Sequence, residues 1–472
     1  MAITIEELQQ RLVGLQDNRD AAEIIGILKE RTIALPAWSD LEKEYNPKKH
    51  PVYTDKQYVD KVKRGKINRL TRFTMSLQKL AVKRMSELIF GIPVKRVYSN
   101  ANDEEKRAAQ IIEGIYRKNH VNALNLQRSK YLYAACETCT IWYTQEVETF
   151  YGGERSPLKL RCRTFTPMNG DSIYPLFDDY DDLIALSVEY TRDNGAGLGT
   201  SHYFETFTKD VHVRWNIGAG GSVLEWFEGI GLGKINGVWI YRPEPVWEDQ
   251  SDNVYEGEWT ISRNGNYIRK NARPNWVVFC DENVRVGQER DDDTLGRNVL
   301  KYPTDAKAQY ATWEQAIDSI KFHLETIQSN FFRNLQLPDM SMENMKATPM
   351  SGEARKMLFL DSQLKVTDES GIWVEFFDRE VAVIKAFAKL MFPHLEKAFE
   401  TLEVEHIITP YQIRDESEKV NILTNATGGA AIMSQRTAVE RAGYVDDVDE
   451  ELRQIQSEQT NDLFNEPTDV IE

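Results

Sequence analysis

Helical spacing of apolar residues dominates the first hundred residues. Apolar side chains recur every three or four positions between Leu77 and Phe90, and the Gly91-Ile92-Pro93 sequence ends the predicted helix. Residues 103–118 predict a further helix. We therefore expect an N-terminal region built from helices.

The pattern changes between about Ser129 and Trp247. Aromatic and β-branched runs such as Thr140-Ile-Trp-Tyr-Thr144 alternate there with turn signals such as Gly152-Gly153 and Asn169-Gly170. This alternation predicts antiparallel strands joined by hairpins. Strands and helices do not alternate regularly, which argues against a doubly wound parallel sheet. The fold class expected for the whole chain is α+β.

The clearest periodicity lies in a helix predicted from about Thr304 to Leu335. Its seam of apolar residues has spacings of four, three, four, three and four: Trp313, Ile317, Ile320, Leu324, Ile327 and Phe331. At about 1.5 Å per residue the helix would be roughly 45 Å long. Another helix is predicted from Ser251 to about Asn271, and a strand at residues 276–279 with a charged tip lies between the two. Such a seam is typical of core packing or of helix contacts in an assembly.

A methionine-rich segment follows, between residues 337 and 350. Long connections within compact domains are usually functional, and methionine makes adaptable apolar contacts. An ordinary exposed connector is an equally good interpretation of the residues alone. A long helical tract is predicted after Ser351, with a kink at Ser370-Gly371, and then a strand at residues 406–409 and a helix opened by Ser434.

Composition and charge narrow the classes of protein. The 472 residues are 41% hydrophobic and 28% charged, enough for roughly two to four domains with a sizeable core. The net charge of -16 argues against a protein that grips DNA through a basic groove, but not against one past which DNA slides. No apolar run reaches the roughly 20 residues of a membrane span, and the N-terminus lacks a secretory pattern. Four cysteines do not suggest a disulfide framework, so we expect a protein made in a reducing cytoplasm.

Motifs for catalysis are weak. The chain has no Gly-x-x-x-x-Gly-Lys-[Ser/Thr] loop, no His-Glu-x-x-His and no Gly-x-Ser-x-Gly. Cys136-Glu-Thr-Cys139 has the spacing of a metal or redox pair, but buried thiols are the favoured interpretation. Acids at residues 178–182 are interpreted as a solvated loop and not as an acid–base pair. We therefore expect no catalytic residue, no metal site and no cofactor.

A basic segment extends from Lys61 to Arg96. Up to Tyr98 it holds eleven Lys and Arg residues against one acid, Glu87. Such a surface could contact nucleic-acid phosphates without reading bases. A solvated helix face, or a partner for acidic surface on a neighbouring subunit, is the favoured interpretation.

The order of several short segments adds a resemblance. They are Asn68-Arg-Leu70 with residues 80–94, which end in Gly91-Ile92-Pro93; Tyr131–Ala135 followed by Thr140–Tyr143; Pro167–Tyr174; Leu337–Met345 with Ser351–Ala354; and Ile407–Asp415, Ile432–Thr437 and Val445–Leu452. In this order, over about residues 61–458, the chain resembles the portal proteins of tailed double-stranded DNA bacteriophages, in the SPP1-like branch.

The resemblance implies a portal-type fold with a mixed α/β wing, a two-helix stem, a small α/β clip, a long wing helix and an α-helical crown. Its parts would be a wing at 1–250, stem helix 1 at 251–273, a clip at 274–303, stem helix 2 at 304–335, a tunnel loop at 336–350, a long kinked wing helix at 351–405, and a crown with an acidic C-terminal tail at 406–472. The seam would join the stem helices to each other and to neighbouring copies.

The same resemblance implies two sets of site residues. The tunnel loop would meet DNA in the channel through Met340, Met342, Asn344, Met345 and Lys346. The clip would bind terminase or adaptors through Glu289, Arg290, Asp291, Asp292, Asp293 and Arg297.

The implied function is structural and not enzymatic. A ring, usually of twelve copies, would sit at one capsid vertex of the virion after assembly in the host cytoplasm, and double-stranded DNA would pass through it without sequence specificity during packaging and ejection. Its partners would be the terminase large subunit, head–tail adaptor proteins, the major capsid protein and a scaffold protein, with no membrane. Two other interpretations stay open on the residues: a hydrolase with its active site in the β-rich middle, and a monomeric adaptor that binds through its acidic tail.

Overall fold

The structure is a computed structural model that describes residues 5–15, 20–30, 33–63, 66–99, 101–195, 199–218, 220–271, 275–279, 307–311, 317–339, 360–411, 416–428, 432–445 and 448–464. The chain divides into two units. The larger unit comprises residues 1–340 and 361–411, and the smaller unit comprises residues 341–360 and 412–472.

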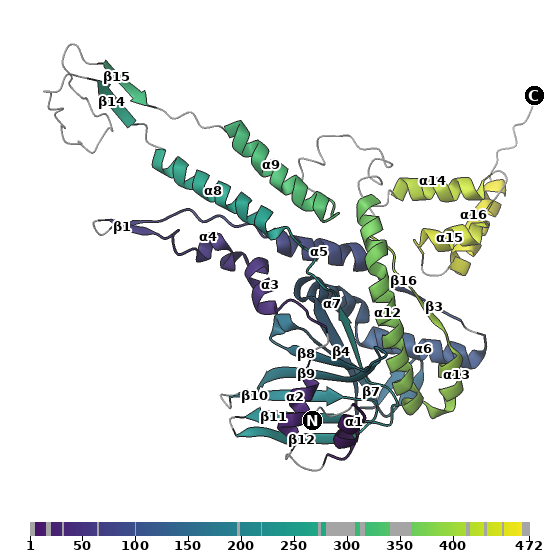
Figure 1. The fold of residues 1–472 in the computed structure, drawn as a ribbon. Coiled ribbons are helices and arrows are strands. Elements are labelled where there is room, and N and C mark those ends of the chain that lie inside the picture. The colour runs from purple at the N-terminus through teal and green to yellow at the C-terminus, as the bar shows by residue number, and fades with distance from the viewer. Residues whose placement is uncertain are drawn as a thin grey trace, which may run out of the picture. The chain divides into compact units, whose positions relative to one another are not determined.

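The larger unit contains an antiparallel five-stranded sheet, in the order β12-β11-β10-β9-β8 (Figure 1). Its strands are β8 (Ser172–Phe177), β9 (Leu183–Asp193), β10 (Thr200–Phe207), β11 (Val211–Gly218) and β12 (Gly221–Gly229). Neighbours in the sequence are neighbours in the sheet, as hairpin connections require. The predicted antiparallel strands of the middle region are confirmed.

Both faces of this sheet are covered by other elements. Helices α1 (Ile5–Val13) and α2 (Ala21–Leu28) cover one face, where Leu12 and Ile24 pack with Phe204 and Trp215. A three-stranded sheet in the order β13-β4-β7 covers the other face. Its strands are β4 (Glu137–Gln145), β7 (Lys159–Phe165) and β13 (Gly237–Tyr241). The core of this region is therefore a sandwich with a helical cover.

Three helices form a second layer: α5 (Leu77–Phe90), α7 (Val121–Ala135) and α12 (Leu360–Met391). Phe90 packs edge-on against Trp373, with ring centroids 4.8 Å apart. Arg128 of α7 and Glu380 of α12 form a fully buried ion pair at 2.7 Å, and the indole of Trp142 in β4 donates to the same carboxylate at 3.1 Å. An aromatic contact thus joins α5 to α12, and a hydrogen bond from Trp142 joins α12 to the β-sandwich.

Apart from helices α8 and α9 and the strands between them in the sequence, the other helices and strands of this unit are short, except for α6. They are α3 (Trp38–Tyr45), α4 (Pro51–Thr54), α6 (Asp103–Lys118), α13 (Glu396–Thr401), β1 (Lys61–Lys63), β2 (Lys66–Asn68), β3 (Lys95–Tyr98), β5 (Thr149–Tyr151), β6 (Glu154–Ser156) and β16 (Val404–Ile407). Strand β3 pairs with β16, about three hundred positions later in the chain.

A long antiparallel helix pair, α8 (Ser251–Asn271) and α9 (Ile317–Asn334), lies side by side in Figure 1. The prediction for α8 is confirmed, and the predicted strand at 276–279 is β14 (Asn275–Phe279). The prediction of a helix from Thr304 is wrong in its first part. Residues 307–311 form β15, which pairs with β14, so that Tyr310 lies opposite Trp276. Pairing with a distant strand outweighs the local helical spacing there.

Three other features of the fold differ from the predictions. The first hundred residues contain strands β1, β2 and β3 as well as helices, because β3 finds its partner far away in β16. Residues 129–135 belong to helix α7 and not to a strand. The long helix α12 runs as one helix through Ser370 and Gly371, where a kink is predicted, and ends at Met391.

The smaller unit consists of three helices among its described residues: α14 (Glu416–Thr427), α15 (Gln435–Ala442) and α16 (Val448–Phe464). The hydroxyl of Ser434 accepts a hydrogen bond from the amide of Thr437, which confirms the predicted helix start. Arg436 of α15 pairs with Asp449 of α16 at 3.1 Å.

Candidate functional site

The predicted seam of α9 faces inward over only half of its length. Phe331 is fully buried and Ile327 is 8% exposed, whereas Ile317, at the start of the helix, is 66% exposed. Ile320 and Leu324 are half-buried between them. Phe322, which lies off the seam, is 72% exposed. The outer half of α9 therefore carries large apolar side chains that the described part of the chain leaves in solvent, and Trp313 lies outside the described residues.

The inner half of α9 meets α8 at a glycine. A Cβ atom at position 257 would lie 3.6 Å from Cγ2 of Ile327 and 2.5 Å from Cε of Met75. The missing side chain of Gly257 thus lets α8 approach both neighbours closely. Two phenylalanines, Phe331 and Phe332, follow with their rings perpendicular at 5.4 Å.

Helix α8 also binds the segment that precedes α5, residues 70–76, which we name the strap. Side-chain oxygens at positions 258, 262 and 266 of α8 accept hydrogen bonds from alternate backbone amides of the strap: Glu258 from Met75 at 2.7 Å, Ser262 from Phe73 at 2.8 Å and Asn266 from Thr71 at 2.7 Å. Four residues of helix advance about 6 Å and two residues of extended chain about 6.6 Å, so the two spacings match.

A buried histidine, His50, contacts Glu258, the α8 residue that binds the strap at Met75. Nδ1 of His50 lies 2.8 Å from the Glu258 carboxylate, and both side chains are buried. Nε2 of the same ring lies 2.7 Å from the carbonyl oxygen of Glu44. The Glu44 carboxylate in turn accepts hydrogen bonds from Trp247 and Ser251, each at 2.7 Å. This network attaches the first turns of α8 to the N-terminal helices.

Helix α9 ends in a Schellman motif. The amide of Leu337 donates to the Phe332 carbonyl and the amide of Gln336 donates to that of Arg333, each at 3.0 Å. Gln336 has a φ of +53°, the left-handed conformation that glycine usually occupies at this position. The chain thus turns sharply after α9 at Gln336, a residue type that disfavours the left-handed conformation.

Side chains from two other helices bind the carbonyls of this turn. Arg84 of α5 donates to the carbonyl oxygen of Pro338 at 2.6 Å. From α12, Lys365 donates to that of Leu335 at 2.6 Å and Ser362 to that of Gln336 at 3.0 Å. We name residues 335–339, together with these three side chains, the neck.

The electrostatics of the neck follow from burial. Burial, helped by the nearby Arg242 guanidinium, lowers the pKa of Lys365 to about 8, although Glu369 and Asp368 oppose the shift. Burial also lowers the pKa of Arg84, and the Asp339 carboxylate acts against that shift. The Arg84 guanidinium lies 4.4 Å from the centroid of the Phe332 ring. Two partly desolvated cations therefore meet the negative end of the α9 dipole.

The predicted tunnel-loop residues Met340, Met342, Asn344, Met345 and Lys346 lie outside the described residues, as do the predicted clip residues Glu289, Arg290, Asp291, Asp292, Asp293 and Arg297. The structure therefore describes α9 and α12 on either side of the tunnel-loop residues, and β14 and β15 on either side of the clip residues. Sequence reasoning missed Arg84, Ser362 and Lys365, because their carbonyl partners are distant in the chain.

Four side chains of the basic segment contact acidic or backbone groups of the same chain. Arg72 pairs with Asp60 at 3.0 Å, Arg96 with Glu113 at 3.4 Å and Lys83 with Glu87 at 3.7 Å, while Arg84 belongs to the neck. These contacts favour the structural interpretation of the segment over a phosphate-binding surface.

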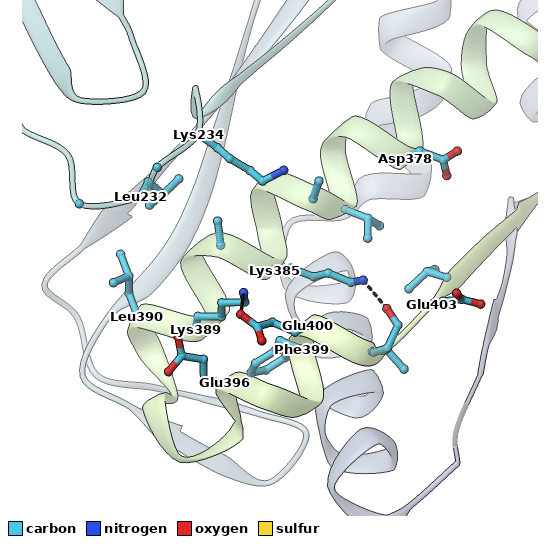
Figure 2. A pocket seen from close by; sticks show the side chains of 17 residues that line it. Leu232, Lys234, Asp378, Lys385, Lys389, Leu390, Glu396, Phe399, Glu400 and Glu403 are labelled. Carbon is cyan, nitrogen blue, oxygen red and sulfur yellow. Dashed lines mark hydrogen bonds and ion pairs between the residues drawn. The ribbon is translucent and has the colours of Figure 1, made fainter.

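A groove of about 740 Å³ lies between α12, α13 and the loop that joins β12 to β13 (Figure 2). Lys385 donates to the carbonyl oxygen of Leu402, and Lys389 pairs with Glu400 at 2.7 Å. Burial lowers the pKa of Lys385. Figure 2 also shows Lys234 and Glu396 at this groove, so both signs of charge line it and no single ligand class is favoured.

The weak chemical motifs agree with their structural interpretations where they are described. Cys136 and Cys139 are buried, and burial raises the pKa of Cys136 to about 12. The Asp178 carboxylate accepts hydrogen bonds from the amides of Tyr180 and Asp182, each at 2.9 Å, as in a turn. Within the described residues, no three His, Cys, Asp or Glu side chains gather as metal ligands. None of the described helices is long and apolar enough to span a membrane.

Comparison with protein families shows to which family the chain belongs. The model of the family described as "Phage portal protein, SPP1 Gp6-like" matches residues 27–463, which is most of the chain. The chain belongs to this family. Portal proteins are structural components of the phage virion, located at a capsid vertex, and the family is not a family of enzymes. Membership in a family of structural proteins favours a structural role over the hydrolase interpretation of the β-rich middle.

Three solved structures resemble this portal protein weakly, each with a TM-score of 0.40. The neck of an empty GTA particle computed with C6 symmetry is 10% identical and covers 77% of this chain and 89% of its own. The virion of a native gene transfer agent particle is 8% identical, and the neck of a native GTA particle computed with C12 symmetry is 9% identical; each covers 90% of this chain and 98% of its own. No curated protein matches the chain.

Proposed function

We propose that the protein assembles into a dodecameric ring at one capsid vertex, through which double-stranded DNA enters during packaging and leaves during ejection. The family match over residues 27–463 carries this proposal. The chain has no P-loop motif, so the energy for packaging would come from a separate terminase ATPase that docks on the ring.

The helix pair α8–α9 supports assembly from several copies. Ile317 and Phe322 on α9 are 66% and 72% exposed, and Ile268 on α8 is 53% exposed. Exposed apolar surface of this kind is typical of protein–protein contact. A closed ring would place the stem of one copy beside that of the next and cover these side chains.

The net charge also suits a conduit. Each copy carries a formal charge of -16, and a ring would multiply it. An acidic channel repels phosphates and keeps DNA from adhering, which passive transport needs. In the proposed tunnel loop, the methionines would make sliding apolar contacts and Lys346 would supply intermittent phosphate contacts.

The remaining assignments are proposals on the same basis. The clip at 274–303 would bind the terminase large subunit and later the head–tail adaptors, through Glu289–Asp293 and Arg297. The wing at 1–250 would face the major capsid protein and a scaffold protein, and the crown at 406–472 would face the capsid interior. DNA contacts would carry no base specificity, because no base-reading element is proposed in the channel.

Particle mass and negative-stain images of the purified protein test the ring. We expect a ring of about a dozen copies with a central hole, and we expect Phe322→Ser to shift the population towards smaller species because it removes apolar contact area. Tyr180→Ser is the matched control, since Tyr180 is 89% exposed in the turn between β8 and β9. A wild-type protein that stays monomeric at all salt and protein concentrations, with capsid and scaffold proteins present, would overturn the proposal.

Deletion of residues 340–346 tests the tunnel loop. We expect the ring to form with an unchanged number of copies, because the seam and the neck lie outside the deletion. DNA packaging or retention should fall, measured as nuclease-protected DNA per particle. Packaging at the wild-type level would remove the tunnel-loop assignment.

A further inference from the structure

The neck lies where the chain leaves α9 and where it enters α12. Residue 339 is the last described residue before the methionine-rich segment, and the chain is next described at Leu360, in the first turn of α12. Ser362 and Lys365 lie in the first two turns of α12, and they donate to the carbonyls of Gln336 and Leu335 on the other side of the segment. Residues that flank positions 340–359 on either side are therefore hydrogen-bonded directly to each other.

A third helix, α5, also binds the neck. Arg84, from the middle of α5, donates to the carbonyl of Pro338, one residue before Asp339. Its guanidinium also packs on the ring of Phe332, which is 2% exposed. Helices α5, α9 and α12 thus converge on five consecutive residues, of which Leu335 and Leu337 are each 4% exposed.

We propose that Arg84 and Lys365 are positioning residues that hold residues 335–339, the last described residues before segment 340–359, against α5 and the start of α12. Both are cations that donate to neutral carbonyls at the end of a helix, where the backbone dipole is negative. The left-handed conformation of Gln336 depends on such contacts, because a non-glycine residue keeps it only when its surroundings determine it.

Arg84 differs from its neighbour Lys83 in exposure and in its contacts. Lys83 precedes Arg84 in α5, but its side chain is 63% exposed and pairs with Glu87 at 3.7 Å. Only the inward-facing residue of the two reaches the neck. Lys83 therefore offers a matched control on the same helix, with the same charge and almost the same position in the sequence.

Hydrogen–deuterium exchange of the full-length protein tests the neck. The amides of Gln336 and Leu337 donate within the Schellman motif, so they exchange when the neck opens. A hydrogen bond to a charged group changes an equilibrium by about ten- to a hundredfold. We expect exchange in peptides over residues 331–339 to become faster by about this factor in Arg84→Gln and in Lys365→Met, and to stay at the wild-type rate in Lys83→Gln.

Wild-type exchange in both neck variants would overturn the proposal. If a variant does not fold, Arg84→Lys and Lys365→Arg replace it, because each keeps a cation and changes its reach. We expect intermediate exchange rates from these two, and rates equal to the wild type would again refute a positioning role.

The relevance of the neck to DNA passage rests on the proposed function of segment 340–359, and a second readout separates the two. Packaged DNA per particle should fall in the variants with faster exchange. Faster exchange with normal packaging would keep the neck and remove the channel role of the segment. Unchanged exchange would remove the neck whatever the packaging result.

Discussion

The buried ion pair between Arg128 and Glu380 allows a sharp test of how the helical layer is held together. Both side chains have no exposed surface, and their nearest atoms are 2.7 Å apart. The Glu380 carboxylate also accepts from Trp142, and Arg128 also donates to Asn125 at 3.0 Å. Replacing one partner leaves the other charge buried and uncompensated, which costs about 3–5 kcal/mol of unfolding free energy.

The cost should not be equal for the two partners. In Arg128→Met, the group left without its ion-pair partner is a carboxyl, and buried carboxyls as a class can be neutral. In Glu380→Met, the group left behind is a guanidinium, which stays charged in proteins. We therefore expect Glu380→Met to be the more destabilised variant.

The assay is thermal unfolding of each variant beside the wild type. At about 2.1 cal/mol/K per residue, a unit of roughly 390 residues loses about 0.8 kcal/mol of stability per degree near its midpoint. The single variants should therefore lower Tm by about 4–6 °C. The double variant Arg128→Leu with Glu380→Leu should lie within about 2 °C of the wild type, because an apolar pair of similar volume replaces a buried ion pair at little cost. A double variant that loses the sum of the single losses would refute this reasoning.

Two further predictions concern glycines and a lysine. Gly371→Ala in α12 should raise Tm by about 1 °C, since alanine is favoured in helices by about 1 kcal/mol and a Cβ there meets no atom within 4 Å. Gly257→Ala should instead lower Tm by about 1–4 °C, because its Cβ would lie 2.5 Å from Cε of Met75. Equal shifts in the two variants would contradict the close contact at the strap. The pKa of Lys365, lowered from 10.5 to about 8, means that the unfolded chain holds more protons between these values, so stability rises with pH in that window. The difference in unfolding free energy between wild type and Lys365→Met should therefore shift by about 2 kcal/mol in favour of the wild type from pH 7.5 to 10, and a constant difference in melting curves would contradict the burial of this amine.

Local signals in the sequence predicted those elements that depend on near neighbours. Helices α5, α6 and α8 were predicted at the bounds that the structure has, since their apolar spacing and end signals lie within the helices themselves. The hairpin order of the middle sheet follows from turn residues between adjacent strands. Family resemblance, and not periodicity, carried the functional interpretation, and the family match confirms membership of the portal protein family.

Elements that depend on distant partners could not be predicted in this way. Strand β15 has helical spacing after it and no strand signal strong enough to outweigh that spacing, yet β14 pairs with it. Predicting the neck would require knowing that Arg84 and Lys365, which are distant in the sequence, contact the same turn. The polar residues at 258, 262 and 266 of α8 did form a stripe with a spacing of four, and this signal could have indicated a bound chain.

The strap has a consequence for how this protein can change during evolution. Glu258, Ser262 and Asn266 bind backbone amides, which every residue except proline supplies, so the strap can exchange most of its side chains without losing these bonds. The α8 positions have no such freedom, because only a few side chains present an oxygen at the right reach. Among closely related chains, substitutions should therefore accumulate on the strap and avoid these three helix positions, with proline excluded at the three donating residues.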